Sequence, residues 1–217
     1  MSAVSGVSGF VFEPVSWHAE VRARLEDRHL VACSDDTALR MRFAVGMQRY
    51  LAMQPLTSVC VLHGRAISTI DDLCDQLERM IPVTKLARTI DGPHGVASLL
   101  RSRTSMMGHG MERARVFVWH DADLLVRRDR ALFNDVVEVL SGVSAELEYS
   151  DEGSVLVQRG VYVGGSKLEE EARRSDSRLN SWSDDGSGIP FWGLVSGLNA
   201  PRTALCRVDH LLESAGR

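Results

Sequence analysis

The chain has few cysteines and none of the patterns in which cysteine binds metal or pairs locally. Its four cysteines show no C-x-x-C pair and no His/Cys spacing of a zinc site; they are Cys33, Cys60, Cys74 and Cys206. Cys60 lies in an apolar run and Cys74 on an apolar helix stripe, which is typical of buried free thiols. The sequence therefore predicts no metal and no other cofactor, and a reducing, cytoplasmic location.

Long hydrophobic runs and an excess of basic residues are also missing. No window approaches the roughly 18 apolar residues that a membrane span requires. No basic region followed by a long apolar segment lies between Met1 and Gly9. The net charge is -4 and the pI is about 6.0, whereas sequence-independent nucleic-acid binding needs a basic field. We therefore expect a soluble protein with neither a membrane nor a nucleic-acid partner.

The most informative segment is a short apolar run that ends in two acids. Val116 to Trp119 is apolar throughout and is followed by His120, Asp121 and Asp123. A run this short, bounded by charge, is typical of a strand covered on both faces, as in parallel sheets. Open α/β sheets place ligands at the carboxyl ends of their strands. We therefore interpret His120, Asp121 and Asp123 as partner-binding candidates at a solvated strand end, and Trp119 as a buried structural residue.

Apolar runs and the spacing of apolar residues indicate how the chain is organised. They predict strands at 59–62, 115–120 and 155–163, and helices at 68–81 and 129–145. This order implies right-handed crossovers and an α/β fold with a small parallel sheet packed with helices. Residues 1–56 are predicted to form a helical N-terminal region, with one helix ending near His29 and the next capped by Asp35 or Asp36. Residues 57–165 form the predicted core, and 166–217 a linker and C-terminal extension that docks on the core.

The acidic strand end resembles that of P-loop ATPases, where an apolar strand directs a carboxylate toward a magnesium ion. In this comparison Leu62 to Thr69 occupies the place of the phosphate loop. That loop needs glycines, whose amides wrap the phosphates, and a lysine followed by serine or threonine. Here Gly64 stands alone before Arg65, Ala66 and Ile67. The sequence therefore predicts neither binding nor hydrolysis of ATP, and a degenerate, nucleotide-free P-loop domain of clamp-loader-like type remains an alternative.

A second resemblance extends from about Val59 to Val163 and is to the barstar family of ribonuclease inhibitors. Val61 to Leu73 is similar to the family's opening, an apolar strand, a glycine turn and a helix that begins near an acid-leucine pair. Phe117 to Asp123 is similar to its second strand, which carries a tryptophan, and the predicted helix from Asp129 to Ala145 and a closing strand complete the order. The resemblance implies a barstar-like α/β core and a noncatalytic, inhibitor-like module that binds another protein.

The chain departs from that family where its function resides. The family's aromatic-Gly-x-Asn-x-Asp-Ala-Leu stretch falls at Asp91 to Leu100, where only Gly92 matches, and Arg101 makes the next turn basic. Inhibition in the family relies on acidic residues there that meet a basic nuclease cleft. We therefore expect no tight inhibition of a barnase-like nuclease. Asp91, His94 and Arg101 are further partner-binding candidates.

The two resemblances imply different numbers of strands. Three parallel strands favour the barstar-like module, whereas five strands with Asp121 after the third favour the P-loop alternative. A third possibility is an enzyme with an unrecognised site. No G-x-S-x-G or H-E-x-x-H motif and no Cys/His pair in a family context supports it. The sequence therefore predicts a protein that is not an enzyme.

Overall fold

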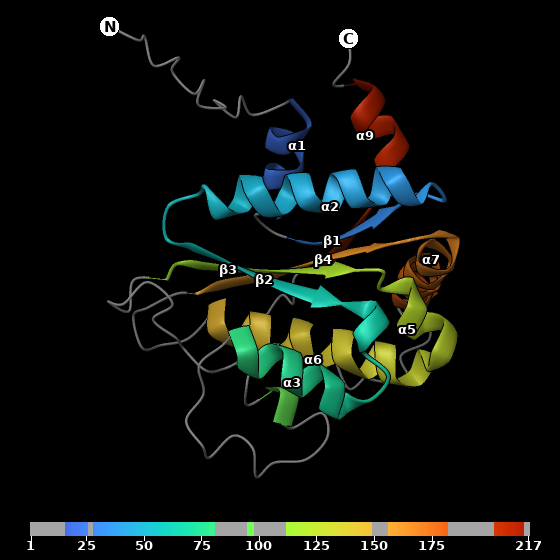
Figure 1. Cartoon of the computed structure of the whole chain (residues 1–217). Coiled ribbons are helices and arrows are strands. Elements are labelled where there is room, and N and C mark those ends of the chain that lie inside the picture. The colour runs from blue at the N-terminus through green and yellow to red at the C-terminus, as the bar shows by residue number, and fades with distance from the viewer. Residues whose placement is uncertain are drawn as a thin grey trace, which may run out of the picture.

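The computed structural model describes residues 16–25, 28–80, 95–97, 112–148, 156–181 and 202–214. They contain a five-stranded sheet with helices on both faces (Figure 1). The order across the sheet is β2-β3-β4-β1-β5, and every neighbouring pair is parallel. The strands are β1 (Arg28–Cys33), β2 (Thr57–His63), β3 (Ala114–His120), β4 (Val157–Gly164) and β5 (Arg202–Arg207). The predicted α/β fold with a parallel sheet packed with helices is confirmed.

Helices form a layer on each face of the sheet. One face is covered by α1 (Ser16–Leu25), α2 (Thr37–Ala52) and α9 (Val208–Ser214). The other is covered by α3 (Ile70–Met80), α5 (Asp123–Arg128), α6 (Arg130–Glu148) and α7 (Ser166–Ser181). A 3-10 turn, η1 (Gly64–Ala66), follows β2. The strands and helices predicted between residues 59 and 163 are present as β2, α3, β3, α6 and β4.

A strand occupies part of the N-terminal region, where only helical cover was expected. The first helix does not continue to His29; α1 ends at Leu25 and β1 begins at Arg28. β1 lies between β4 and β5, and its last four residues are all buried. A short apolar run has too few residues for its periodicity to distinguish a strand from a helix. β1 is a strand because it pairs with β4 and β5, which lie far along the chain.

The region after residue 165, expected to be a linker and a C-terminal extension that docks on the core, forms regular structure. α7, β5 and α9 lie within it. The charged residues of α7 pair across its turns, as when Arg173 donates to Glu169 at 2.8 Å, and its Leu168 is buried against the core. Composition alone does not separate a charged loop from a helix that carries ion pairs four residues apart.

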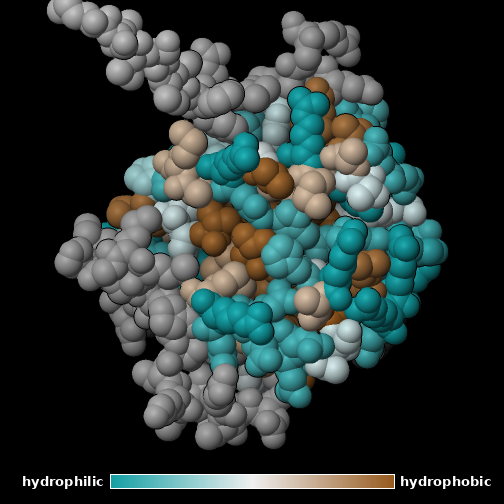
Figure 2. Space-filling model, in the orientation of Figure 1, coloured by the Kyte–Doolittle hydropathy of each residue, from teal (hydrophilic) through white to brown (hydrophobic). Residues whose placement is uncertain are grey.

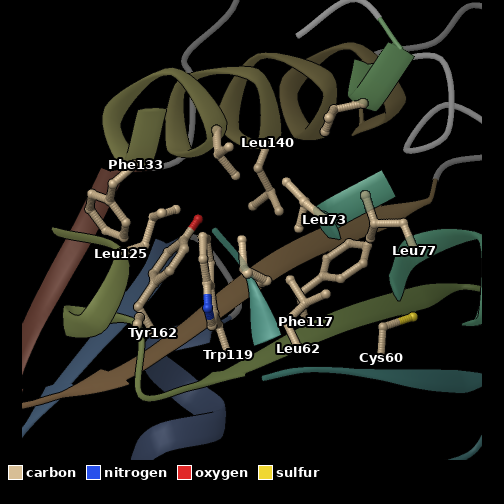
Figure 3. Close-up of a cluster of buried hydrophobic side chains, with 14 of the residues drawn as sticks. Cys60, Leu62, Leu73, Leu77, Phe117, Trp119, Leu125, Phe133, Leu140 and Tyr162 are labelled. Carbon is tan, nitrogen blue, oxygen red and sulfur yellow. The ribbon is translucent and has the colours of Figure 1, made fainter. Parts of the chain in front are cut away.

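The aromatic centre of the core lies on the β3 and β4 side of the sheet. Trp119 is 1% exposed, and its ring centroid lies 5.7 Å from that of Phe133 and 6.0 Å from that of Tyr162. Figure 3 shows these three rings between the sheet and α6. The prediction that Trp119 is a buried structural residue is confirmed.

A buried histidine in β1 makes the stability of this fold depend on pH. His29 is fully buried, and its Nδ1 accepts a hydrogen bond of 2.8 Å from the amide of Gly160 in β4. Burial, and to a smaller extent the charge of Arg159, lowers the pKa of His29 from 6.5 to about 3. The folded protein therefore keeps this side chain neutral at pH values where the unfolded chain protonates it.

The free energy of unfolding is expected to fall as the pH is lowered from about 6.5 to about 3, because the unfolded state then binds more protons. His29→Asn retains an acceptor at the position of Nδ1 for the Gly160 amide and removes the titrating ring, so its stability should fall less over the same range. Urea denaturation at a series of pH values measures the difference, with His210→Asn, a change at an exposed histidine, as the control. Equal slopes for wild type and His29→Asn would contradict the assignment.

Candidate functional site

The carboxyl ends of the five parallel strands meet at one edge of the sheet, and this edge forms the candidate site. The chain leaves β1 through α2 on one face and leaves β4 through α7 on the other. Because β1 and β4 are neighbours, their connections diverge between Cys33 and Gly164. Open α/β sheets bind ligands at such a switch point. The candidate site therefore consists of the turns after β1 and β4 and the acidic end of β3.

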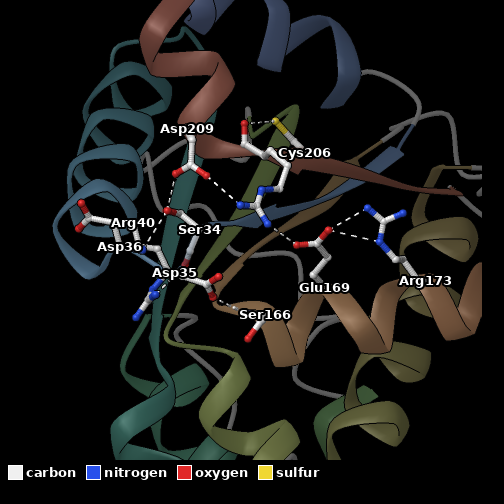
Figure 4. Close-up of polar contacts among 10 residues, drawn as sticks. Ser34, Asp35, Asp36, Arg40, Ser166, Glu169, Arg173, Cys206 and Asp209 are labelled. Atoms are coloured by element: carbon white, nitrogen blue, oxygen red, sulfur yellow. Dashed lines mark hydrogen bonds and ion pairs between the residues drawn. The ribbon is translucent and has the colours of Figure 1, made fainter.

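Two aspartates fill the turn between β1 and α2 (Figure 4). Asp36 caps α2, because its Oδ1 accepts from the amides of Ala38 at 2.7 Å and Leu39 at 3.3 Å. Oδ1 of Asp35 accepts at 3.1 Å from the amide of Ser166, the first residue of α7. Amides at helix N-termini are the groups that bind phosphate in many α/β proteins. Here carboxylates of the chain itself bind such amides at both helices.

The presence of β1 changes which turn corresponds to the phosphate loop of a P-loop ATPase. The sequence analysis placed it after β2, at Leu62 to Thr69, because β1 was not recognised as a strand. Among the described residues the first strand is β1 and Asp121 follows the third, so the corresponding segment is Ser34 to Thr37. This segment has no glycine and no lysine. The expectation that no nucleotide binds therefore rests on the same missing residue types, glycine and lysine, but at the turn after β1 and not at the turn after β2.

A chain of charged contacts joins this turn to β5 and α7. Ser34 Oγ donates to Oδ1 of Asp209 at 2.5 Å, and Arg207 donates to Oδ2 of Asp209 at 3.0 Å and to Glu169 at 2.8 Å. The hydrogen bond from Ser34 lowers the pKa of Asp209, and the hydrogen bonds from Arg173 and Arg207 lower the pKa of Glu169. Both carboxylates therefore remain ionised, and Arg207 is engaged by acids of the same chain.

Asp123 and His120, two of the predicted site residues, are buried at the end of β3. Asp123 is 2% exposed and its carboxylate lies 2.8 Å from the guanidinium of Arg127, one turn later in α5. The expectation of a solvated strand end is wrong for Asp123, because α5 folds back over it and brings Arg127 to it. His120 is also buried, with Nε2 at 2.5 Å from Nε2 of Gln48 in α2. Burial lowers the pKa of His120, and the neighbouring His63 lowers it further.

Asp121, the third of these residues, is partly exposed and has a strained backbone. Its φ is 50°, in the left-handed region that favours glycine. The carbonyl of Asp121 lies so close to Gly64 that a Cβ on Gly64 would stand 2.2 Å from its oxygen. Its carboxylate accepts a hydrogen bond of 2.9 Å from Nε of Arg65. The close approach of the β2 and β3 ends therefore holds Asp121 in this conformation.

Asp121→Gly should raise the free energy of unfolding by up to about 1 kcal/mol, because glycine adopts this φ without strain. The lost contact with Arg65 contributes little, since that side chain is 72% exposed. Asp121→Ala removes the same carboxylate but keeps the strain, so it is the matched control and should melt within a few degrees of wild type. Thermal denaturation of both variants measures the difference. A glycine variant that melts below the alanine variant would contradict the role assigned to φ.

Three of the predicted site residues, Asp91, His94 and Arg101, lie outside the described residues. The sequence analysis gave Asp35 and Asp36 only a capping role, although an apolar run directly precedes them. Arg40 was also missed; it lies in α2 and donates to the carbonyl of Ser34 at 2.7 Å and to Thr37 Oγ1 at 3.0 Å.

No protein-family model matches the chain, and no curated protein matches it. Within the described ranges, no group of three or more histidine, cysteine, aspartate or glutamate side chains is placed to hold a metal ion. None of the helices described is long and apolar enough to cross a membrane.

Proposed function

We propose that the protein is a nucleotide-free relative of the P-loop NTPases that acts as a noncatalytic, protein-binding module. The sheet has five parallel strands and Asp121 follows the third, which favours this class over the three-stranded barstar-like alternative. The observation that carries the proposal is that Asp35 and Asp36 bind the N-terminal amides of α7 and α2. Where a nucleotide's phosphates would bind, the chain supplies its own negative groups.

The two aspartates disfavour a nucleotide in two ways. They satisfy amides that phosphate oxygens would need, and their charges repel phosphate. Arg40 is close to this turn, but its Nη atoms already donate to Ser34 and Thr37. At the end of β3, where P-loop ATPases direct a carboxylate toward magnesium, Asp121 is paired with Arg65 and Asp123 with Arg127. The acids at this strand end therefore contact basic groups of the same chain.

A protein partner and a cytoplasmic location are supported by more general features. The net charge of -4 disfavours nucleic acid as a partner. Met41 and Met53 are 49% and 62% exposed, and exposed methionines are common on surfaces that bind proteins. All four cysteines are free thiols, as expected in a reducing compartment.

Calorimetry with ATP, ADP and inorganic phosphate, each with magnesium, tests this function. Wild type is expected to show no micromolar binding and no ATP hydrolysis. The double variant Asp35→Asn/Asp36→Asn removes both charges and keeps a good cap for α2, so it should fold and bind phosphate more tightly than wild type. Micromolar binding of ATP by the wild-type protein, or its hydrolysis, would refute the proposal.

A further inference from the structure

β2 is at the edge of the sheet, and no described strand pairs with its outer side. The hydrogen bonds at its carboxyl end show which backbone groups point outward: the amide of His63 donates to Gln76 Oε1 at 2.9 Å, and its carbonyl accepts from Gln76 Nε2 at 3.2 Å. The amide of Val61 donates to Met80 Sδ at 3.1 Å. Since backbone groups alternate along a strand, those of Thr57 and Val59 point outward too. Within the described part of the chain, no hydrogen bond engages them on that side.

This edge lacks the features that usually keep strands of different molecules apart. Residues 57–61 include no charged residue, proline or glycine, the types by which edge strands are commonly protected. Val59 and Val61 are partly exposed, and Met53, just before the strand, is 62% exposed. Figure 2 shows apolar residues at the surface on the face where β2 lies in front in Figure 1. An open and apolar strand edge is a surface suited to strand pairing.

We propose that two copies of the chain pair through β2, antiparallel about a twofold axis at Val59, so that their sheets become continuous. In this register Val59 lies opposite Val59 of the second copy, and Thr57 lies opposite Val61. All of these residues point their backbone groups outward, so each opposed pair can exchange both N–H···O bonds. The carbonyl of Thr57 then replaces the sulfur of Met80, a weak acceptor, at the Val61 amide.

The ends of the strand fit this register and favour a second copy over another protein. Beyond Val61, the next outward residue is His63, whose backbone Gln76 already satisfies. The residue opposite His63 would be Pro55, which has no amide to donate. Pairing therefore stops at the same point on both copies, without leaving an amide unpaired. The two ends match in this way when β2 pairs with β2 of a second copy, and this favours a second copy as the partner.

The charges beside β2 also fit an antiparallel arrangement. At the amino end Arg113 is exposed, and its amide donates to the carbonyl of Leu56 at 2.8 Å. At the carboxyl end lies α3, held to His63 by Gln76, and this helix carries four acids and one arginine. Antiparallel pairing places the basic end of one copy beside the acidic helix of the other, whereas parallel pairing would bring like ends together.

Charge substitution at the axis tests the pairing, with mass in solution measured by light scattering. Wild type should be a dimer, and Val59→Lys and Val59→Glu should each be monomeric, because like charges then meet across the axis. An equimolar mixture of the two variants should form a mixed dimer, because opposite charges then meet. His210→Lys, an exposed change on α9, is the matched control and should remain dimeric.

Val59→Cys tests the same register without introducing charge. Opposed residues that exchange both hydrogen bonds have Cα atoms about 5.5 Å apart, within the span of a disulfide. Mild oxidation should give a covalent dimer on a non-reducing gel, whereas His210→Cys and wild type should not. A monomeric wild type, a dimer that survives both charge variants, or a Val59→Cys protein that does not cross-link would overturn the pairing. Nucleotide calorimetry tests the proposed function separately, since β2's outer edge is not part of that site.

Discussion

Trp119→Ala is expected to lower the free energy of unfolding by about 3–5 kcal/mol, the loss typical of emptying a large aromatic site in a core. Among the described residues Trp119 has the largest fully buried side chain, and it lies on β3, which has a strand on each side. Its ring packs against Phe133 of α6 and Tyr162 of β4 (Figure 3). Removing it therefore loosens the contact between the sheet and α6 as well as leaving a cavity. A loss of this size approaches the whole stability of an ordinary domain.

Urea denaturation followed by far-UV circular dichroism measures this loss. Trp119→Phe is the matched control, because it keeps an aromatic ring beside Phe133 and Tyr162 and should lose much less stability. An alanine variant as stable as wild type would mean that β3 is not packed between the two layers as described.

The elements that could be predicted from the sequence are those whose pattern is local. The run from Val116 to Trp119 is apolar throughout and ends abruptly in charge, and α3 repeats its apolar residues at helical spacing. β1 carries only a short form of the first property, because Leu30 to Cys33 is apolar and Asp35 and Asp36 follow closely. It becomes a strand because β4 and β5 pair with it on both sides, and β5 begins at Arg202, far along the chain. Such pairing leaves no local pattern in a short run.

The candidate site shows the same division between local and long-range information. Asp121 and Asp123 could be placed at a strand end because the apolar run directly precedes them. The contact of Asp35 with the Ser166 amide could not be predicted, because it depends on β1 lying next to β4. The burial of Asp123 depends likewise on the path of α5, which brings Arg127 over it. The sequence thus indicated which edge of the sheet carries acids, and the strand order determined what those acids contact.

The second large effect on stability is expected at a buried ion pair near the amino end of β3. Arg115 is fully buried, and it donates to Glu112 through Nε at 3.1 Å and through Nη2 at 2.7 Å. Ser58, which lies opposite Arg115 on β2, also donates to the carboxylate of Glu112. Such a pair need not stabilise a fold compared with apolar residues, but loss of one partner leaves a charge with little access to water.

Arg115→Met is therefore expected to lower the free energy of unfolding by about 3–5 kcal/mol, because it leaves the carboxylate of Glu112 without its arginine partner. The double variant Arg115→Met/Glu112→Gln removes that charge and keeps an acceptor for Ser58, so it should be more stable than the single variant. Arg65→Met, which breaks the exposed pair with Asp121, is the control and should change stability by about 0.5 kcal/mol or less. Urea denaturation of the four proteins, wild type included, provides the comparison. A double variant no more stable than Arg115→Met would show that the loss comes from packing of the arginine side chain and not from the stranded charge.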